Sequence, residues 1–460
     1  MKHIPWDFQQ KLYTQTMDLI DSGERSIIIQ LATRAGKSII AALMIEEFAG
    51  NRKEPVYFIG HKKILVTQMS DELTENGMKH GIIAPWAPQL KYRVQVISKD
   101  TFFNRFKTMK ETGWKPPRLI IIDECHMAMG NRYKEIIESY PESIIIGLSA
   151  TPIRLDGKGL GVLFDKMVTG PAIRELQRKK RLCEIETFAV DFDDSGMHSR
   201  GGDYVKSEVL EKVDKPAVLK DLVKHWEQFA KDKKTLTFAA SIKHAKDISE
   251  EFNNAGYPSI SVSSHDSSAE IKNKLNDYYS GKYINLVSID LFTMGLTVKD
   301  CSCILMARPT QSLMVYMQSG GRGMIYKPGK VLIIIDAVNN WKRHGLIDDD
   351  RGWDLTAGGK KPKELSTLKK CPACYRPVPV SSRVCPHCGF LWVEVEAVGS
   401  RIPEEKSGKL VKIDRNNGLI LKVARNAKTL EDAINIAGDQ GYKIWTKDLR
   451  KKVDRVGVTV

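Results

Sequence analysis

The amino-acid sequence predicts an α/β protein with doubly wound parallel sheets. Short runs of mostly apolar residues alternate along the chain with helix-like amphipathic segments. Because the runs are apolar at consecutive positions, they are typical of parallel strands that helices cover on both faces. The length of 460 residues is enough for about three domains. The predicted strands are Ser26–Leu31, Pro55–Ile59, Arg118–Ile122, Ser143–Leu148, Thr235–Ala239, Ile284–Ile289, Cys303–Met306 and Val331–Ile335.

Composition and charge exclude several classes of protein. An apolar fraction of 42% and a charged fraction of 28% exclude wholesale disorder and a collagen-like fibre. No apolar run has the roughly 18 residues of a membrane span, and the first ten residues contain no apolar signal core. We therefore expect a cytoplasmic protein of a bacterial or phage-infected cell, not a secreted or membrane protein. The net charge is +15, and residues 351–460 contribute +10 of it, which favours a nucleic-acid partner over a merely solvated basic surface.

Changes in composition along the chain predict four segments. The first α/β unit is expected to cover residues 1–180 and the second residues 181–350. The polar stretch 191–203 is expected to form a loop or linker. A basic linker with a four-cysteine module should follow at 351–395, and a basic C-terminal region at 396–460.

A phosphate-binding turn is predicted directly after the strand at Ser26–Leu31. The turn ends in Gly36, Lys37 and Ser38 and opens a helix, so its backbone N–H groups can face an anion. Lys37 can reach the outer phosphates of ATP, and the Ser38 hydroxyl can hold Mg²⁺. The strict motif would require glycine at Leu31, so a basic turn that merely opens a core helix is the alternative. The candidate cofactor-binding residues in this turn are Thr33, Arg34, Ala35, Gly36, Lys37 and Ser38.

Two carboxylates follow the predicted strand Arg118–Ile122, at the edge of the sheet where parallel α/β proteins bind ligands. Asp123 can hold Mg²⁺ through water, and Glu124 can then polarise the water that attacks phosphorus. His126 could connect this site to the neighbouring unit. The alternative is an ordinary loop cluster, but the position after a strand and downstream of Lys37 favours a catalytic site.

With these two motifs the sequence resembles a superfamily 2 helicase of the DExH type. The resemblance continues, in the order expected for the family, over residues 6–323, and it implies two RecA-like domains with ATP and Mg²⁺ between them. The further matching segments are Gln9 after Trp6 and Phe8, Gly60–Gln68 (motif Ia), Ser149–Arg154 (motif III), Thr237–Ser241 (motif IV), Phe292–Leu296 (motif V) and Gln318–Gly323 (motif VI).

The resemblance implies a role for each matching residue. Gln9 would recognise adenine, and Gly295 would belong to the nucleotide site. Gln318 would orient the attacking water together with Glu124, and Arg322 would stabilise the charge that develops on the γ-phosphate. Ser149 and Thr151 would couple the two domains together with His126. The candidate nucleic-acid contacts are His61, Lys62, Thr101, His265 and Thr293, which would grip the backbone regardless of base sequence.

A narrower resemblance points to RadD-like DNA repair helicases and to phage-encoded branch-migration helicases. It rests on Arg308–Ser312, Asp336–Asn340, the pair His344 and Gly345, the four-cysteine module and Gly441–Trp445. It implies a DNA helicase or translocase that acts on branched or forked DNA in repair, recombination or replication. Single-strand-binding or recombination proteins are the implied protein partners.

The sequence also departs from the family pattern at three places. Ile325 stands where motif VI usually has a second arginine, so Arg322 must be the main charge-stabilising residue, or another arginine such as Arg308 substitutes. Thr297 stands where motif V commonly has an acidic residue. Arg34 replaces a glycine of the phosphate-binding turn.

Four cysteines near residue 380 have the spacing of a metal site. Cys371, Cys374, Cys385 and Cys388 form two C-x2-C knuckles with ten residues between them. Four thiolates at this spacing suit tetrahedral Zn²⁺ in a structural site, with an iron–sulfur cluster as the alternative. The zinc ribbon could bind DNA, dock a protein or simply hold together a segment too short to fold alone.

Three other functions remain compatible with the sequence. An RNA helicase or RNA-remodelling ATPase would be stimulated more by RNA than by DNA. The motor part of a nuclease is a further alternative, but we find no convincing cluster of nuclease carboxylates in the tail. A zinc-ribbon nucleic-acid-binding protein that does not hydrolyse ATP is favoured by the departures at Arg34 and Ile325.

Overall fold

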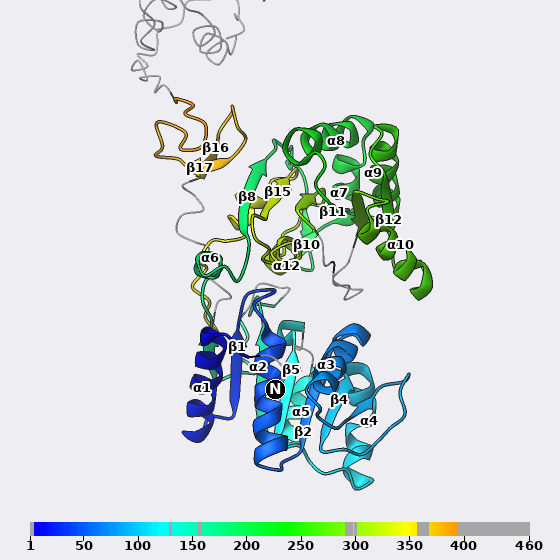
Figure 1. The fold of residues 1–460 in the computed structure, drawn as a ribbon, viewed down its shortest axis with the longest axis vertical. Coiled ribbons are helices and arrows are strands. Elements are labelled where there is room, and N and C mark those ends of the chain that lie inside the picture. The colour runs from blue at the N-terminus through cyan, green and yellow to red at the C-terminus, as the bar shows by residue number, and fades with distance from the viewer. Residues whose placement is uncertain are drawn as a thin grey trace, which may run out of the picture. The chain divides into compact units, whose positions relative to one another are not determined.

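The structure, a computed structural model, describes residues 4–127, 131–154, 159–289, 298, 301–356 and 368–392. Among these residues it has two parallel α/β sheets, of seven and six strands, and two short antiparallel hairpins (Figure 1). The predicted fold class is therefore confirmed. None of the described helices has the length and apolar character needed to cross a membrane.

The first sheet has the strand order β3-β4-β2-β5-β6-β1-β7. Its strands are β1 (Ser26–Gln30), β2 (Val56–Gly60), β3 (His80–Ile83), β4 (Val94–Ser98), β5 (Leu119–Asp123), β6 (Ile144–Ser149) and β7 (Lys166–Thr169). The accompanying helices are α1 (Asp7–Asp21), α2 (Lys37–Ile45), which continues as a π-helical turn over Glu46–Asn51, α3 (Lys63–Glu75), α4 (Lys99–Glu111), the short 3₁₀ helix η2 (Cys125–Met127), α5 (Asn131–Ser139) and α6 (Ile173–Arg178).

The second sheet has the strand order β12-β13-β11-β14-β15-β8. Its strands are β8 (Glu184–Ala189), β11 (Thr235–Phe238), β12 (Ser259–Val262), β13 (Asn285–Ser288), β14 (Cys303–Met306) and β15 (Val331–Asp336). The helices are α7 (Lys206–Val213), α8 (Pro216–Ala230), α9 (Ile242–Asn254), α10 (Ser268–Ser280), α12 (Leu313–Gly321) and α13 (Asn340–His344). The hairpins are β9 (Ser199–Arg200) with β10 (Asp203–Tyr204) and β16 (Leu368–Lys370) with β17 (Pro377–Pro379).

The central strands are buried on both faces, which explains their continuous apolar runs. In β1, Ile28 packs in one apolar cluster with Phe102 of α4, whereas Ile27 and Ile29 pack in the other cluster with Ile40 of α2. Successive side chains of a strand point to opposite faces, so every position of such a strand needs an apolar residue. Apolar packing on both faces thus holds in place the sheet that carries the site.

All eight predicted strands are confirmed to within two residues at either end. The four edge strands, β3, β7, β8 and β12, are additional, as is the internal strand β4. The stretch 191–203 is not wholly a loop, because the hairpin of β9 and β10 lies at its end. The predicted C-terminal region 396–460 lies outside the described residues.

Candidate nucleotide-binding site

The strand order places three functional segments side by side. β5, β6 and β1 are neighbours in the first sheet and run parallel. Their carboxyl ends therefore meet at one edge, and that edge carries Asp123, Ser149 and the turn that leads to Lys37. Topology thus brings together the residues that the sequence motifs predicted separately.

The phosphate-binding turn needs a glycine at Gly36 for two reasons. Its φ is +86°, in the left-handed region that L side chains rarely adopt, and a Cβ atom there would lie 2.3 Å from Nε2 of Gln9. Gln9 is 3% exposed and its Nε2 donates to the carbonyl of Ala35 at 2.9 Å. Its Oε1 accepts the N–H of Trp6 at 2.8 Å. Gln9 therefore fixes the backbone of the turn directly.

Two carboxylates with different electrostatic surroundings follow β5. Burial, together with the charge of Glu124, raises the pKa of Asp123 to about 7, and Lys37 opposes this shift. Burial also disfavours the charged form of Glu124, but nearby cations, above all Lys37, hold its pKa below the usual value. Oε1 of Glu124 lies 3.9 Å from Nζ of Lys37. Asp123 is thus a partly buried carboxylate that a cation would stabilise, and Glu124 is an ionised carboxylate beside it.

A cavity of about 520 Å³ collects most of the predicted residues. It is lined by the phosphate-binding turn, the end of β5, the segment after β2 and one face of α12, so both sheets contribute. The predicted residues that line it are Thr33, Arg34, Gly36, Lys37, Ser38, His61, Lys62, Asp123, Glu124, His126, Gln318 and Arg322. The chemistry of the donors fits Mg²⁺, since the Ser38 hydroxyl and the Asp123 carboxylate are the oxygen ligands that this ion prefers.

His126 lies in a hydrogen-bonded chain that joins the two sheets. Nε2 of Gln318 on α12 donates to Nε2 of His126 at 3.2 Å. Nδ1 of His126 lies 2.8 Å from Oγ of Ser149, which also accepts the N–H of Thr151 at 3.1 Å. Burial lowers the pKa of His126, so the ring is neutral and its proton on Nδ1 can bond Ser149. The three residues predicted to couple the domains are therefore in contact.

The helix α12 packs directly on the phosphate-binding turn. A Cβ atom at Gly321 would lie 2.8 Å from Cβ of Thr33. Arg322 follows at the end of the helix, one turn after Gln318, so both side chains face the same cavity. Burial, and then the charge of Arg34, lowers the pKa of Arg322 to about 10, which leaves it protonated at neutral pH.

The structure also places the residues at which the sequence departs from the family pattern. Ile325 forms an isolated β-bridge with Leu182. The suggested substitute Arg308 does not line the nucleotide cavity, because its Nη2 bonds Oδ2 of Asp203 at 2.9 Å. Arg34 lines the cavity and has a φ of +69°.

The candidate nucleic-acid contacts are dispersed. Oη of Tyr133 lies 3.0 Å from Nε2 of His61, and burial lowers the pKa of His61 to about 3, so it offers no charge to a phosphate. Thr101 is 6% exposed within α4 and has little surface for a ligand. His265 is exposed in the turn before α10. Thr293 and Gly295 lie outside the described residues, as does Thr297.

One exposed aromatic residue near this site was not predicted. Trp86 follows β3 and is 41% exposed. Nζ of Lys63 lies over its ring, 5.3 Å from the ring centre. Lys63 directly follows Lys62 at the cavity. The signal was present in the sequence, because the run Pro85–Arg93 interleaves aromatic and basic residues, a pattern typical of single-strand binding.

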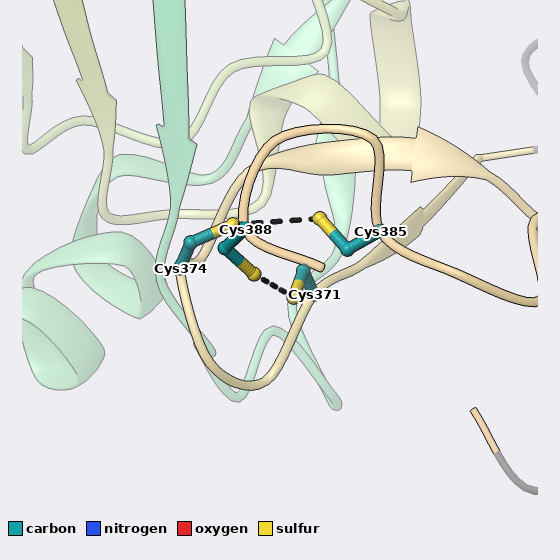
Figure 2. A group of neighbouring side chains, drawn as sticks. All are labelled: Cys371, Cys374, Cys385 and Cys388. Carbon is teal, nitrogen blue, oxygen red and sulfur yellow. Dashed lines mark hydrogen bonds between the residues drawn. The ribbon is translucent and has the colours of Figure 1, made fainter. Parts of the chain in front are cut away.

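The four cysteines converge on one point (Figure 2). Sγ of Cys371 lies 3.7 Å from Sγ of Cys388, and Sγ of Cys374 lies 3.7 Å from Sγ of Cys385. Sulfurs that share one tetrahedral Zn²⁺, at a Zn–S distance of about 2.3 Å, lie about 3.8 Å apart. The donor set therefore fits a single zinc ion, and it is too tight for a cluster of several iron atoms.

The cysteine module is attached to the edge strand of the second sheet. The carbonyl of Tyr375 accepts the N–H of Ala189 in β8 at 2.8 Å. Nη2 of Arg376 lies 2.6 Å from Oε2 of Glu186 in the same strand. One backbone bond and one ion pair thus hold the module against β8.

Comparison with known proteins agrees with this geometry. Residues 2–154 match the family model "Type III restriction enzyme, res subunit", residues 214–324 match "Helicase conserved C-terminal domain", and residues 369–394 match "Uncharacterised protein family UPF0547". The first two models cover most strands of the first and second sheet, respectively. The protein is a superfamily 2 helicase and an ATP hydrolase.

Individual relatives support the same class. A 51.5 kDa protein of Lactococcus phage (isolate 7-9) is 29% identical over 79% of this chain and 77% of its own length. The ATP-dependent DNA helicase uvsW of Enterobacteria phage T4 is 24% identical over 75% of this chain and 68% of its own length. A solved fragment described as an HsdR subunit of a type I restriction enzyme from Vibrio vulnificus YJ016 has a TM-score of 0.59 and 21% identity, and covers 74% of this chain and 64% of that chain. This last likeness concerns the fold alone.

Proposed function

We propose that this helicase acts on DNA, as a translocase or strand-separating enzyme at branched or forked sites in repair, recombination or replication. The observation that supports a motor function is the bond between Gln318 and His126, which joins the two α/β units at the nucleotide cavity. The phage T4 relative is a DNA helicase by name, which supports DNA as the substrate. The basic charge of the chain supports a polyanionic partner.

The residues around the cavity divide the work of ATP hydrolysis. Lys37 and Arg322 neutralise charge on the transferred phosphoryl group, and Glu124 and Gln318 orient the attacking water. Ser38 and Asp123 would hold Mg²⁺, which supplies further positive charge at the phosphates. Gln9 holds the turn in shape, and we propose that it also meets the adenine.

The hydrogen-bonded chain supplies the coupling. Lys37 and Glu124 belong to the α/β unit of the first sheet, whereas Gln318 and Arg322 belong to that of the second. A nucleotide that contacts both groups favours their approach, and loss of the γ-phosphate removes that attraction. His126 would transmit the change to Ser149 and Thr151. If each domain grips the nucleic-acid backbone, repeated cycles produce steps along a strand.

For the grip we propose Lys62, His265, Thr293 and the unpredicted Trp86 with Lys63. Backbone contacts from the cations would be sensitive to salt, and stacking on Trp86 would be insensitive to base identity. The neutral ring of His61 and the buried Thr101 are better suited to supporting these segments than to contacting phosphate. Single-strand-binding or recombination proteins are the proposed partners, and the cytoplasm of a bacterial or infected cell the proposed location.

The test is ATP hydrolysis by the purified full chain, alone and with single-stranded, duplex and forked DNA or with RNA. Glu124→Gln should abolish hydrolysis, whereas Glu111→Gln, on the exposed surface of α4, should not. Strong stimulation by forked DNA supports the proposal, and strand displacement is then the next assay. Greater stimulation by RNA would favour an RNA helicase. Binding of DNA without hydrolysis, in a folded and zinc-loaded protein, would contradict the enzymatic proposal.

A further inference from the structure

The phosphate-binding turn contains an arginine in a backbone conformation that suits glycine. Arg34 has a φ of +69°, where an L side chain is strained and a glycine would be relaxed. A residue that brings no advantage would be expected to be glycine at this place. The strain therefore directs attention to what the side chain of Arg34 contacts.

Arg34 lines the nucleotide cavity and also contacts the second α/β unit. Its Nη2 donates to the carbonyl of Val298, which precedes β14 in the second α/β unit, at 3.4 Å. Its Nε is buried and has no hydrogen-bond partner within the described residues. Arg322 is close enough for the charge of Arg34 to lower its pKa. Two arginines, one from each α/β unit, thus line the same cavity.

Cations outnumber carboxylates among the described residues that line the cavity. Among the described residues that line it, Arg34, Lys37, Lys62 and Arg322 are cations, and Asp123 and Glu124 are the carboxylates. His126 is neutral and does not change the net charge of these residues. A polyphosphate would offset this excess of positive charge and would offer a hydrogen-bond acceptor to the buried N–H of Arg34.

We propose that Arg34 is a catalytic arginine that contacts the γ-phosphate beside Arg322 and takes the role left open by Ile325. This inference rests on the proposed ATPase function. In the reaction, the water oxygen bonds to the γ-phosphorus, and the bond from that phosphorus to the bridging oxygen breaks. The bridging oxygen keeps the electron pair as ADP leaves, and the proton of the water passes to the released phosphate or to Glu124. Arg34 stabilises the negative charge on the phosphoryl oxygens during this transfer.

The variant Arg34→Gly separates this role from a structural one, because the two predict opposite results. If the side chain serves no catalytic purpose, glycine relaxes the turn, and hydrolysis stays the same or improves. If Arg34 contacts the γ-phosphate, kcat falls roughly 100-fold while KM for ATP changes less than about threefold. Arg34→Lys, which keeps the charge but loses the planar fork, should lie between the two.

A binding measurement provides a second readout that does not depend on turnover. In the Glu124→Gln background, Arg34→Gly should reduce the preference for ATP over ADP about tenfold, because only ATP has the γ-phosphate. Equal losses of ATP and ADP affinity, or an unchanged kcat in Arg34→Gly, would overturn the inference. A wild-type chain that hydrolyses no ATP would instead overturn the proposed function, so the two failures are distinguishable.

Discussion

Nε2 of Gln318 and Nε2 of His126 lie 3.2 Å apart, although the two residues belong to different α/β units and are separated by 192 positions in the chain. The bond has a defined direction. His126 is neutral and its Nδ1 bonds Ser149, so its Nε2 accepts from the amide of Gln318. Opening the cavity by moving α12 must therefore break a bond to a buried ring.

The variant His126→Ala should weaken coupling more than chemistry. It removes the acceptor for Gln318 and the partner of Ser149, a loss worth about 1 kcal/mol or more per bond. We expect the nucleic-acid-stimulated rate of ATP hydrolysis to fall at least about tenfold, and the unstimulated rate to fall less. His198→Ala, at an exposed histidine, is the control. Equal losses in both rates would argue against a coupling role.

Gly321 should not tolerate a side chain. An added Cβ atom would lie 2.8 Å from Cβ of Thr33, so Gly321→Ala must push α12 away from the phosphate-binding turn. We expect kcat for ATP hydrolysis to drop about tenfold, because Arg322 moves with the helix. Gly50→Ala is the matched control, since its Cβ would meet only Cγ of Glu46 at 3.7 Å. Unchanged kinetics in Gly321→Ala would mean that the contact does not persist during turnover.

Acid should destabilise the second domain through His244. This ring is fully buried, its Nδ1 accepts the N–H of Ala240 at 3.2 Å, and burial lowers its pKa to about 4. The unfolded chain binds a proton near pH 6.5, so the stabilisation is complete above that pH and is lost as the pH falls towards 4, by on the order of 3 kcal/mol. His244→Asn keeps an acceptor but cannot take up a proton. Thermal unfolding at pH 7 and pH 4.5 should show a smaller pH dependence for the variant, and an equal dependence would refute the assignment.

The cysteine module should bind about one zinc ion per chain. Metal analysis of the purified protein should find it, and Cys385→Ser should lose it together with the order of the module, because the remaining thiolates cannot close a tetrahedral site. Cys183→Ala, at a buried cysteine outside the cluster, should keep the zinc. Iron in place of zinc, with its visible absorption, would contradict the assignment.

Trp86 offers a test of the proposed DNA path. Replacement by alanine should weaken binding of single-stranded DNA about threefold to tenfold, since one stacked base contributes on the order of 1 kcal/mol or more. Trp86→Phe should retain most of the affinity. ATP hydrolysis without nucleic acid should remain at the wild-type rate, because Trp86 does not line the nucleotide cavity. Fluorescence anisotropy with a labelled oligonucleotide measures the effect, and unchanged affinity in the alanine variant would place the path elsewhere.

The central strands were predictable because burial on both faces leaves a continuous apolar run. The edge strands were not, since each has a neighbour on one side only and therefore keeps polar residues, as in β7 (Lys166–Thr169). β4 is fully buried, but Gln95 interrupts its apolar pattern. The Nε2 of Gln95 donates to the carbonyls of Leu90 and Tyr92, a local arrangement that no periodicity indicates.

The candidate site likewise has residues that could be predicted from the sequence and relationships that could not. Residues such as Lys37 and Asp123 belong to local motifs, and their positions follow from a strand and the turn after it. The presence of Arg34 and Arg322 at one cavity depends on how α12 meets the turn, which is a contact between distant segments. The sequence left Arg308 open as one candidate for a substitute arginine, whereas the structure places Arg308 against Asp203.

The attachment of the cysteine module to β8 has a consequence for solubility. β8 is an edge strand, and unpaired N–H and carbonyl groups of such a strand can pair with another chain. The bond from Ala189 to Tyr375 and the nearby Arg376 shield one end of this edge. Removal of bound metal by a chelator would then leave the edge of β8 unpaired. The protein would self-associate through β-pairing before its catalytic centre unfolds.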